Sequence, residues 1–251
     1  MKIIGMIHLE TLPGSKGHKN MKHVTKKALQ DAEALIKGGV DSILIENTED
    51  HPHTEKLKEE AILAFISIAK EIVQRVTVSV GICALWNDYK AGLRIAKASG
   101  ASFIRVPVFV DKFKTEAGII TGTPEDVISF RKQINAEKIK IMADIHVKHS
   151  VRLTKRTIEE SAKDALAKGA DELIVTGKVT GDAPVIDDLR RVRNACPNAK
   201  ILVGSGTTPQ NLKDFAKYAD AAIVGTYIKI NDKVSPDKVK EIVNQGKRLI
   251  R

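Results

Sequence analysis

The sequence is poor in the residues that would cross-link it or anchor it in a membrane. It contains only two cysteines, Cys83 and Cys196, so we expect neither a disulfide framework nor a structural zinc site made of cysteines alone. No apolar run approaches the ~20 residues that span a bilayer, and no signal peptide precedes the first apolar run. We therefore expect a cytoplasmic protein without a membrane-spanning segment, in a reducing compartment.

Aromatic residues are also scarce, at 4% of the chain, and neither an aromatic-rich RNA-binding motif nor a zinc-finger spacing is present. The 41 Lys and Arg exceed the 31 Asp and Glu, which gives a net charge of +10. Because the basic residues are spread along the chain, we interpret most of them as solvated helix faces around a basic ligand mouth. This pattern favours anionic metabolites as partners and makes nucleic acid a low-ranking alternative.

Eight apolar, β-branched runs alternate with helix-patterned segments along the 251 residues. The runs cover residues 3–7, 42–45, 76–82, 102–106, 139–145 and 172–175, with two more inside 200–226. Such alternation predicts a parallel sheet with right-handed crossovers. Eight units in a chain near the ~250 residues typical of a TIM barrel predict one (β/α)₈ barrel, residues 1–251. A doubly wound open sheet is the alternative, but it lacks the usual G-x-G-x-x-G at the first turn. A long loop is expected over 109–121.

Two glycine turns follow the last two apolar runs. Small residues there would let backbone N–H groups approach an anion. Thr208-Pro209 predicts the start of the next helix, whose positive end would lie beside the first turn. Paired turns late in a barrel of this length indicate a phosphate site, although glycines also serve simple tight turns. The predicted phosphate-binding residues are Gly204, Ser205, Gly206, Gly225 and Thr226.

Candidate catalytic residues follow the fifth predicted strand. Asp144, His146 and Lys148 have the same parity, so in an extended chain they would point the same way. A carboxylate, an imidazole and an ammonium on one face could transfer protons and stabilise a developing oxyanion. The alternative is that Asp144 pairs with Lys148 while His146 only packs.

Further polar residues lie where other predicted strands end. Arg105 could bind a ligand carboxylate or phosphate with two hydrogen bonds, or it could neutralise Glu46. We predict the following substrate-binding residues: His8, Glu46, Asn47, Arg105, Thr176 and Gly177. His8, Glu46, Asp144 and His146 could also ligate a divalent ion such as Mg²⁺, but no short metal motif is present, so no metal or other cofactor is predicted. His51 and His53 lie in a polar loop and are expected at the surface.

Several of these segments resemble the BtpA/SgcQ family. The matching segments are Gly5-Met6-Ile7-His8-Leu9, Leu12-Pro13-Gly14, residues 41–47, 103–106, 143–149 and 174–177, Leu202-Val203-Gly204-Ser205-Gly206 and Ile223-Val224-Gly225-Thr226. The resemblance covers essentially the whole chain and implies a barrel of the ribulose-phosphate-binding class. The family is named for a role in photosystem I biogenesis or stability in cyanobacteria. Pro107 and Trp86 depart from the family pattern at the predicted mouth, so the ligand could differ.

The residues and the resemblance together predict a protein that binds a phosphorylated small molecule at the C-terminal face of the barrel. The predicted chemistry is proton transfer, isomerisation or a lyase-type step. The rival class is a non-catalytic biogenesis or stability factor that uses the barrel as a binding platform. The sequence leaves a homo-oligomer open.

Overall fold

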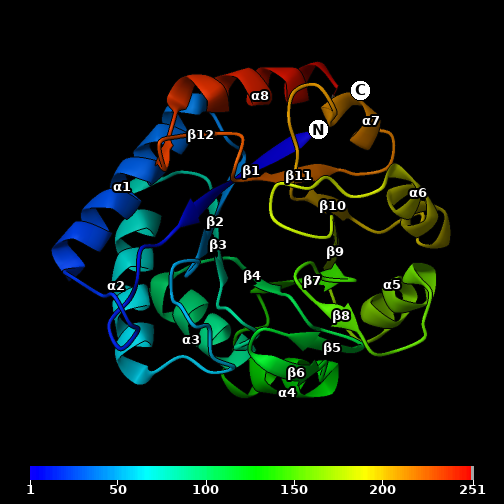
Figure 1. Ribbon diagram of the computed structural model, residues 1–251, viewed down its shortest axis with the longest axis horizontal. Helices are drawn as coiled ribbons and strands as arrows, with labels where there is room; N and C mark the ends of the chain where they lie inside the picture. The colour runs from blue at the N-terminus through cyan, green and yellow to red at the C-terminus, as the bar shows by residue number, and fades with distance from the viewer. Residues whose placement is uncertain (250–251) are drawn as a thin grey trace.

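Eight parallel strands close into a barrel in the computed structural model, which describes residues 1–249 (Figure 1). Around the barrel the strand order is β1-β11-β10-β9-β7-β4-β3-β2. The barrel strands are β1 (Lys2–His8), β2 (Ser42–Glu46), β3 (Ser79–Cys83), β4 (Phe103–Val106), β7 (Lys140–Ile145), β9 (Glu172–Thr176), β10 (Ile201–Gly204) and β11 (Ala221–Val224). The predicted TIM barrel is therefore confirmed.

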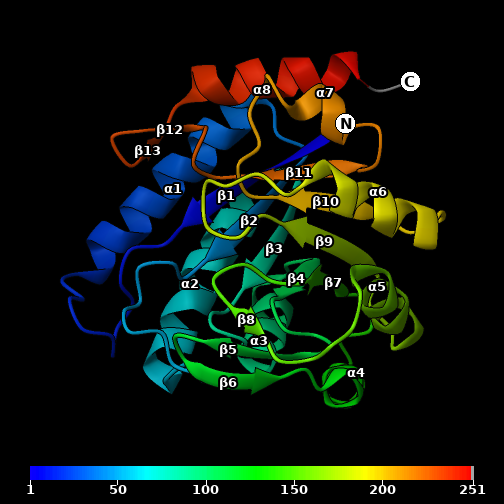
Figure 2. The ribbon, with the colours of Figure 1, turned by 45° about the vertical axis from the view of Figure 1, so that its right-hand side comes forward.

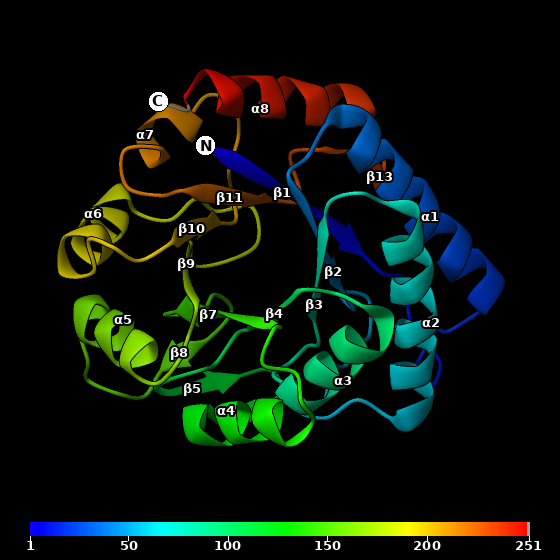
Figure 3. The ribbon, with the colours of Figure 1, turned by 180° about the vertical axis from the view of Figure 1, so that it is seen from behind.

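Helices cover the outside of the barrel all the way round, as the view from behind also shows (Figure 3). They are α1 (Met21–Gly38), α2 (Glu59–Arg75), α3 (Tyr89–Ser99), α4 (Pro124–Gln133), α5 (Ile158–Ala167), α6 (Ile186–Ala195), α7 (Leu212–Phe215) and α8 (Pro236–Arg248). Their ends follow local chemistry. Asn20 caps α1 by accepting a hydrogen bond from the Lys22 N–H, and Gly39 ends α1 in the left-handed conformation. Ser235 and Pro236 start α8 as expected.

The barrel lumen is a packed apolar layer. It is filled by Ile4, Met6, Leu44, Cys83, Phe103, Met142, Ile174, Leu202 and Ile223, which all eight strands contribute. The Phe103 ring occupies the space where a side chain at Gly81 would point, since a Cβ there would lie 2.0 Å from the ring. The lumen is therefore a solid floor, and a ligand can bind only above it, where the strands end.

Two predicted segments differ from the structure. Residues 109–121 are not a loop: β5 (Lys112–Thr115) and β6 (Gly118–Thr121) form a hairpin, which pairs with β8 (Val151–Arg152) in a small separate sheet (Figure 2). Thr208-Pro209 does not start a helix, because α7 begins only at Leu212 and has four residues. A helix this short supplies no substantial dipole, so the helix argument for phosphate binding fails.

The first strand and the last helix pack together. The Met1 ammonium donates a hydrogen bond to the Gly246 carbonyl at 2.8 Å, which places the N-terminus against α8 (Figure 1). Between β11 and α8 lies a short hairpin of β12 (Lys229–Ile230) and β13 (Lys233–Val234). Within residues 1–249, no helix combines the length and the apolar character that crossing a membrane requires.

Candidate active site

Polar residues stand one step above the apolar floor on most barrel strands. Side chains two apart on a strand point to the same side, so the residue two positions after a lumen residue lies in the next layer toward the mouth. The pairs are Met6 and His8, Leu44 and Glu46, Phe103 and Arg105, Met142 and Asp144, Ile174 and Thr176, Leu202 and Gly204, and Ile223 and Gly225. At the ends of seven strands the chain thus changes from an apolar residue to a polar residue or glycine two positions further along.

Arg105 is the centre of this polar layer. Its Nε and one terminal nitrogen each donate to Asp144 at 2.8 Å, and its other terminal nitrogen donates to Glu46 at 3.1 Å. All three side chains are buried. Burial alone would raise the pKa of Glu46, but the Arg105 guanidinium lowers it to about 2, so Glu46 is ionised at neutral pH. Arg105 therefore neutralises Glu46, which was one of its two predicted roles. It also borders the mouth cavity, where the other predicted role, ligand binding, would need it.

His8 is a neutral hydrogen-bond donor in this arrangement. Burial lowers the pKa of His8 to about 4. The Lys229 ammonium lies 2.6 Å from His8 Nδ1, and an ammonium can only donate, so Nδ1 accepts. The neutral ring then carries its proton on Nε2, which lies beside Gly225 at the cavity. His8 can therefore offer an N–H to a ligand oxygen.

A cavity of about 150 Å³ joins these side chains to both glycine turns. The predicted residues that line it are His8, Glu46, Arg105, Lys148, Gly204, Ser205, Gly206, Gly225 and Thr226. Lys148 reaches it from the loop after β7 and donates to Thr180 Oγ1 at 3.0 Å. Burial, together with the charge of Arg105, lowers the pKa of Lys148, so its ammonium gives up a proton more readily than that of an exposed lysine.

Two hydroxyls beside the first glycine turn are buried without a hydrogen-bond partner among residues 1–249. They are Ser205 Oγ and Thr176 Oγ1. Buried polar atoms are normally paired, so these two mark a place that suits a polar ligand. Thr176 does not line the cavity itself; it lies behind Gly204.

The first glycine turn is held from both sides. Asn211 donates to the Gly206 carbonyl at 2.8 Å and accepts from the Thr208 N–H at 2.9 Å. On the other side the backbone of the β9–α6 loop approaches so closely that a Cβ on Gly206 would lie 2.2 Å from the Ala183 nitrogen. Gly206 also has a φ of 56°. The turn is therefore built from backbone contacts that glycine permits.

The expectation that Asp144, His146 and Lys148 converge on one cavity is wrong for His146 and for Asp144, because of the three only Lys148 lines the mouth cavity. β7 ends at Ile145, and His146 has a φ of 58°, so the alternation on which the parity argument rested stops there. Its ring lies between Arg152 and Ser161 of α5, with Nε2 3.3 Å from Ser161 Oγ, outside the barrel mouth. Asp144 lies beneath Arg105 with both oxygens paired, so it can orient Arg105 but does not face the cavity.

Two predicted substrate-binding residues also serve the scaffold. The Asn47 amide accepts from the Leu85 N–H at 2.7 Å and donates to Asp50 at 3.1 Å, which ties the loops after β2 and β3 together. Gly177 permits close backbone packing, because a Cβ there would lie 2.2 Å from the Asp182 carbonyl oxygen. Neither residue lines the mouth cavity.

Three residues of the site, Lys229, Thr180 and Tyr227, were not predicted from the sequence. Thr180 and Tyr227 line the cavity, and Lys229 orients His8. Lys229 and Tyr227 follow Gly225-Thr226 closely, so extending that motif by a few residues would have found them. Thr180 is held at the mouth by a hydrogen bond between its hydroxyl and His149 Nε2, 2.8 Å apart. No local sequence pattern indicates this contact.

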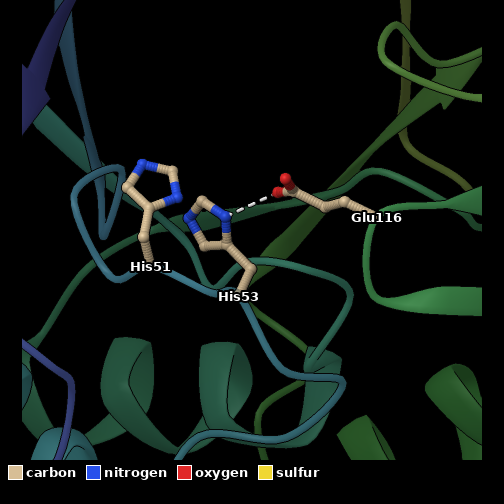
Figure 4. A group of neighbouring side chains, drawn as sticks. All are labelled: His51, His53 and Glu116. Carbon is tan, nitrogen blue, oxygen red and sulfur yellow. Dashed lines mark hydrogen bonds and ion pairs between the residues drawn. The ribbon is translucent and has the colours of Figure 1, made fainter.

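The four residues considered as ligands for a divalent ion do not form a metal cluster. Within the described residues, the group with suitable spacing is His51, His53 and Glu116 (Figure 4). The expectation that His53 lies at the surface is wrong, since it is 8% exposed, whereas His51 is exposed as expected. Glu116 lies in the turn of the β5–β6 hairpin that the sequence analysis treated as a loop.

Solved structures resemble the barrel at low sequence identity. 3-Hexulose-6-phosphate synthase from Salmonella typhimurium has a TM-score of 0.65 at 17% identity, with all of both chains covered. Thiamine phosphate pyrophosphorylase from Pyrococcus furiosus has a TM-score of 0.62 at 16% identity, covering 100% of this chain and 97% of that one. N-(5'-phosphoribosyl)anthranilate isomerase from the same organism has a TM-score of 0.60 at 14% identity, covering 99% and 100%. At such identities the likeness shows the fold.

Sequence relatives show the family. An uncharacterized protein of Pyrococcus furiosus is 37% identical over 99% of this chain and 95% of its own length. The photosystem I biogenesis protein BtpA of Synechocystis is 32% identical over 96% of this chain and 86% of its own length. The sequence model of the BtpA family matches residues 1–248. The chain therefore belongs to the BtpA family.

Proposed function

We propose that this protein binds a phosphorylated small molecule at the mouth of its barrel and catalyses a proton transfer on it, as part of an isomerisation or lyase-type reaction in the cytoplasm. One observation carries the proposal: the same cavity is bordered by both glycine turns and by Lys148, Arg105 and His8. The names of the similar solved structures, a hexulose-phosphate synthase and a phosphoribosylanthranilate isomerase among them, add support because they place phosphorylated compounds on this fold.

The phosphate would lie between Gly204–Gly206 and Gly225–Thr226. Small residues there leave room for an anion, and Ser205 offers a buried hydroxyl without a partner in the described structure. The net charge of +10 favours approach of an anion. The rest of the ligand would extend toward Lys148 and Arg105.

The proton would move through Lys148. Its lowered pKa keeps a larger fraction of the amine neutral than an exposed lysine would have. His8 would donate its Nε2 proton in a hydrogen bond to an oxygen where negative charge develops. Asp144 would hold Arg105 in place, and Glu46 would remain a charged partner of Arg105 and not an acid.

A matched pair of variants at Thr226 tests the phosphate site. Thr226 is exposed and lines the cavity, so substitution there spares the core. Thr226→Asp adds a negative charge at the phosphate position, while Thr226→Asn adds a side chain of the same size without charge. Thermal melts against inorganic phosphate and a panel of phosphorylated metabolites, with and without Mg²⁺, should show stabilisation of wild type and Thr226→Asn and loss of it in Thr226→Asp. Equal stabilisation of both variants would contradict the phosphate site.

A second candidate function is a non-catalytic biogenesis or stability factor. The observation that favours it is the Synechocystis relative, which is named for photosystem I biogenesis. Turnover of a metabolite that also stabilises the fold would favour the enzyme. A protein partner retained through purification, with no metabolite consumed, would favour the factor.

A further inference from the structure

A second group of functional side chains lies at the rim of the mouth, away from the glycine turns. His51 and His53 lie in the loop between β2 and α2, and Glu116 lies in the turn of the β5–β6 hairpin. One ligand atom from each of the three lies within 4.8 Å of those of the other two. The loop and the hairpin are far apart in the sequence, so the fold brings these groups together.

His53 is held from one side by Glu116. Its Nδ1 lies 2.7 Å from Glu116 Oε1, and Trp86 Nε1 donates to the same oxygen at 3.1 Å. Burial tends to raise the pKa of Glu116, but the hydrogen bond from His53 lowers it overall, so Glu116 is a carboxylate. Because a carboxylate only accepts, His53 Nδ1 carries a proton. Its other nitrogen, Nε2, then has a free lone pair in the neutral ring.

His53 Nε2 is the atom that remains to be explained. It is buried and has no hydrogen-bond partner among residues 1–249. A simple ion pair with Glu116 does not remove the problem, because a protonated ring would bury an N–H donor at Nε2 instead. The His51 ring lies on the side of His53 away from Glu116, 4.7 Å between ring centroids at an angle of 72° (Figure 4). Two imidazoles therefore meet at the unpaired nitrogen.

We propose that His51 and His53 bind a divalent transition-metal ion, with Zn²⁺ as the best match, and that Glu116 holds His53 in the ligating orientation. Neutral imidazole is a preferred zinc ligand. A ligating histidine almost always donates its second ring N–H to a carboxylate or carbonyl, which is the contact that His53 makes with Glu116. The metal ion thus gives His53 Nε2 the partner that the described part of the chain does not supply.

The proposed metal site borders a cavity that a ligand could occupy. His51, His53 and Glu116 border a cavity of about 440 Å³ that Glu46, Arg105 and Lys148 also line. Zn²⁺ is usually four-coordinate, so two histidine ligands leave positions free for water or a ligand. Oxygen atoms of a ligand in this cavity could occupy those positions while its phosphate lies at the glycine turns.

Metal binding by the purified, chelator-stripped protein tests the proposal. Titration calorimetry with Zn²⁺ should give one equivalent per chain, and Co²⁺ should give the visible absorption of a low-symmetry site. His51→Ala should abolish both signals, and since His51 is exposed this variant should fold. Glu116→Gln should weaken binding about 10–100-fold, as expected for a residue that orients a ligand.

His23→Ala is the matched control, because His23 is an exposed histidine on α1 outside the cluster. It should bind Zn²⁺ like wild type. The proposal is overturned if wild type takes up no stoichiometric Zn²⁺, or if His51→Ala binds as tightly as wild type. Full affinity in Glu116→Gln would overturn the role of Glu116. Thr226→Asp should bind Zn²⁺ normally, so the metal site and the phosphate site can fail independently.

Discussion

The two sides of the barrel mouth are built in different ways. On the β10–β11 side the cavity wall is backbone, in the turns at Gly204–Gly206 and Gly225–Thr226. On the β2–β4–β7 side it is charged side chains, with Arg105 joined to residues 39 and 59 positions away in the sequence. The first side depends on local conformation, and the second depends on closure of the barrel. Substitutions on the two sides should therefore change different measured properties.

The largest effect should come from substituting Lys148. The comparison is between Lys148, which lines the cavity, and His146, which lies against α5. Lys148→Met should lower kcat by about 10²–10⁴-fold on the substrate found in the metabolite screen, since it removes the proton-transfer group. His146→Gln should keep near wild-type turnover because its ring lies against α5. Lys178→Met, at an exposed lysine of the neighbouring loop, is the control. A loss in His146→Gln as large as in Lys148→Met would contradict this assignment.

Arg105 should dominate stability on the charged side. Arg105→Met leaves Asp144 and Glu46 buried without their partner, which should cost about 3–5 kcal/mol in the free energy of unfolding by urea. Arg94→Met removes an exposed pair with Glu59 and should cost no more than about 1 kcal/mol. Adding Asp144→Asn to Arg105→Met should restore part of the loss. A cost for Arg105→Met similar to that of Arg94→Met would show that the buried network is not needed.

On the backbone side, Gly206 can be compared with Gly118. Both have a positive φ, but a Cβ at Gly206 would meet the Ala183 backbone at 2.2 Å, whereas at Gly118 no atom of residues 1–249 lies within 4 Å of the Cβ position. Gly118→Ala should cost about 1 kcal/mol and Gly206→Ala about 2–3 kcal/mol, with weaker phosphate stabilisation in Gly206→Ala only. Thermal and urea unfolding measure both. Equal costs would mean that the β9–α6 loop moves freely away from the turn. Because any side chain at Gly206 would clash with the β9–α6 loop, Thr226 is the better position at which to introduce a negative charge.

The effect that is smallest at neutral pH is proton binding at His8, because it changes stability only below about pH 6.5. The pKa of His8 is about 4 in the folded protein, below its ordinary value near 6.5, so between these values the unfolded chain binds the proton that the folded chain refuses. Stability should therefore fall as the pH drops from about 6.5 to about 4. His8→Gln should flatten this dependence by up to about 1.4 kcal/mol per pH unit. Parallel curves for wild type and His8→Gln in urea unfolding would contradict the neutral state of His8.

The sequence predicted the barrel and its glycine turns because both depend on short-range patterns. Apolar runs, helix caps such as Ser235-Pro236 and the Gly204–Gly206 turn are each visible within a few residues. Arg105 and Glu46 were also placed correctly at the mouth, since a charge at the end of a buried strand has few other places to go.

The remaining errors arise where the chain leaves regular structure. A parity argument holds only while the strand continues, and β7 stops one residue before His146. The β5–β6 hairpin has short strands with few apolar residues, and Glu116 in its turn meets His53 only through tertiary packing. Asn47 has a residue type suited to ligand binding, but its partners Leu85 and Asp50 are fixed by loop geometry that no spacing reveals.

At the ends of seven barrel strands the lumen residue and the residue two positions later lie in different layers, which has a consequence for how the sequence can change in evolution. Met142 and Asp144 lie on the same side of the same strand, yet Met142 packs in the apolar floor and Asp144 pairs with Arg105 in the polar layer. A lineage can therefore exchange upper residues, provided that Arg105 and its two carboxylate partners change together, while the lower residues keep the barrel closed. Substrate specificity could then change in the polar layer while the packing of the apolar floor is kept.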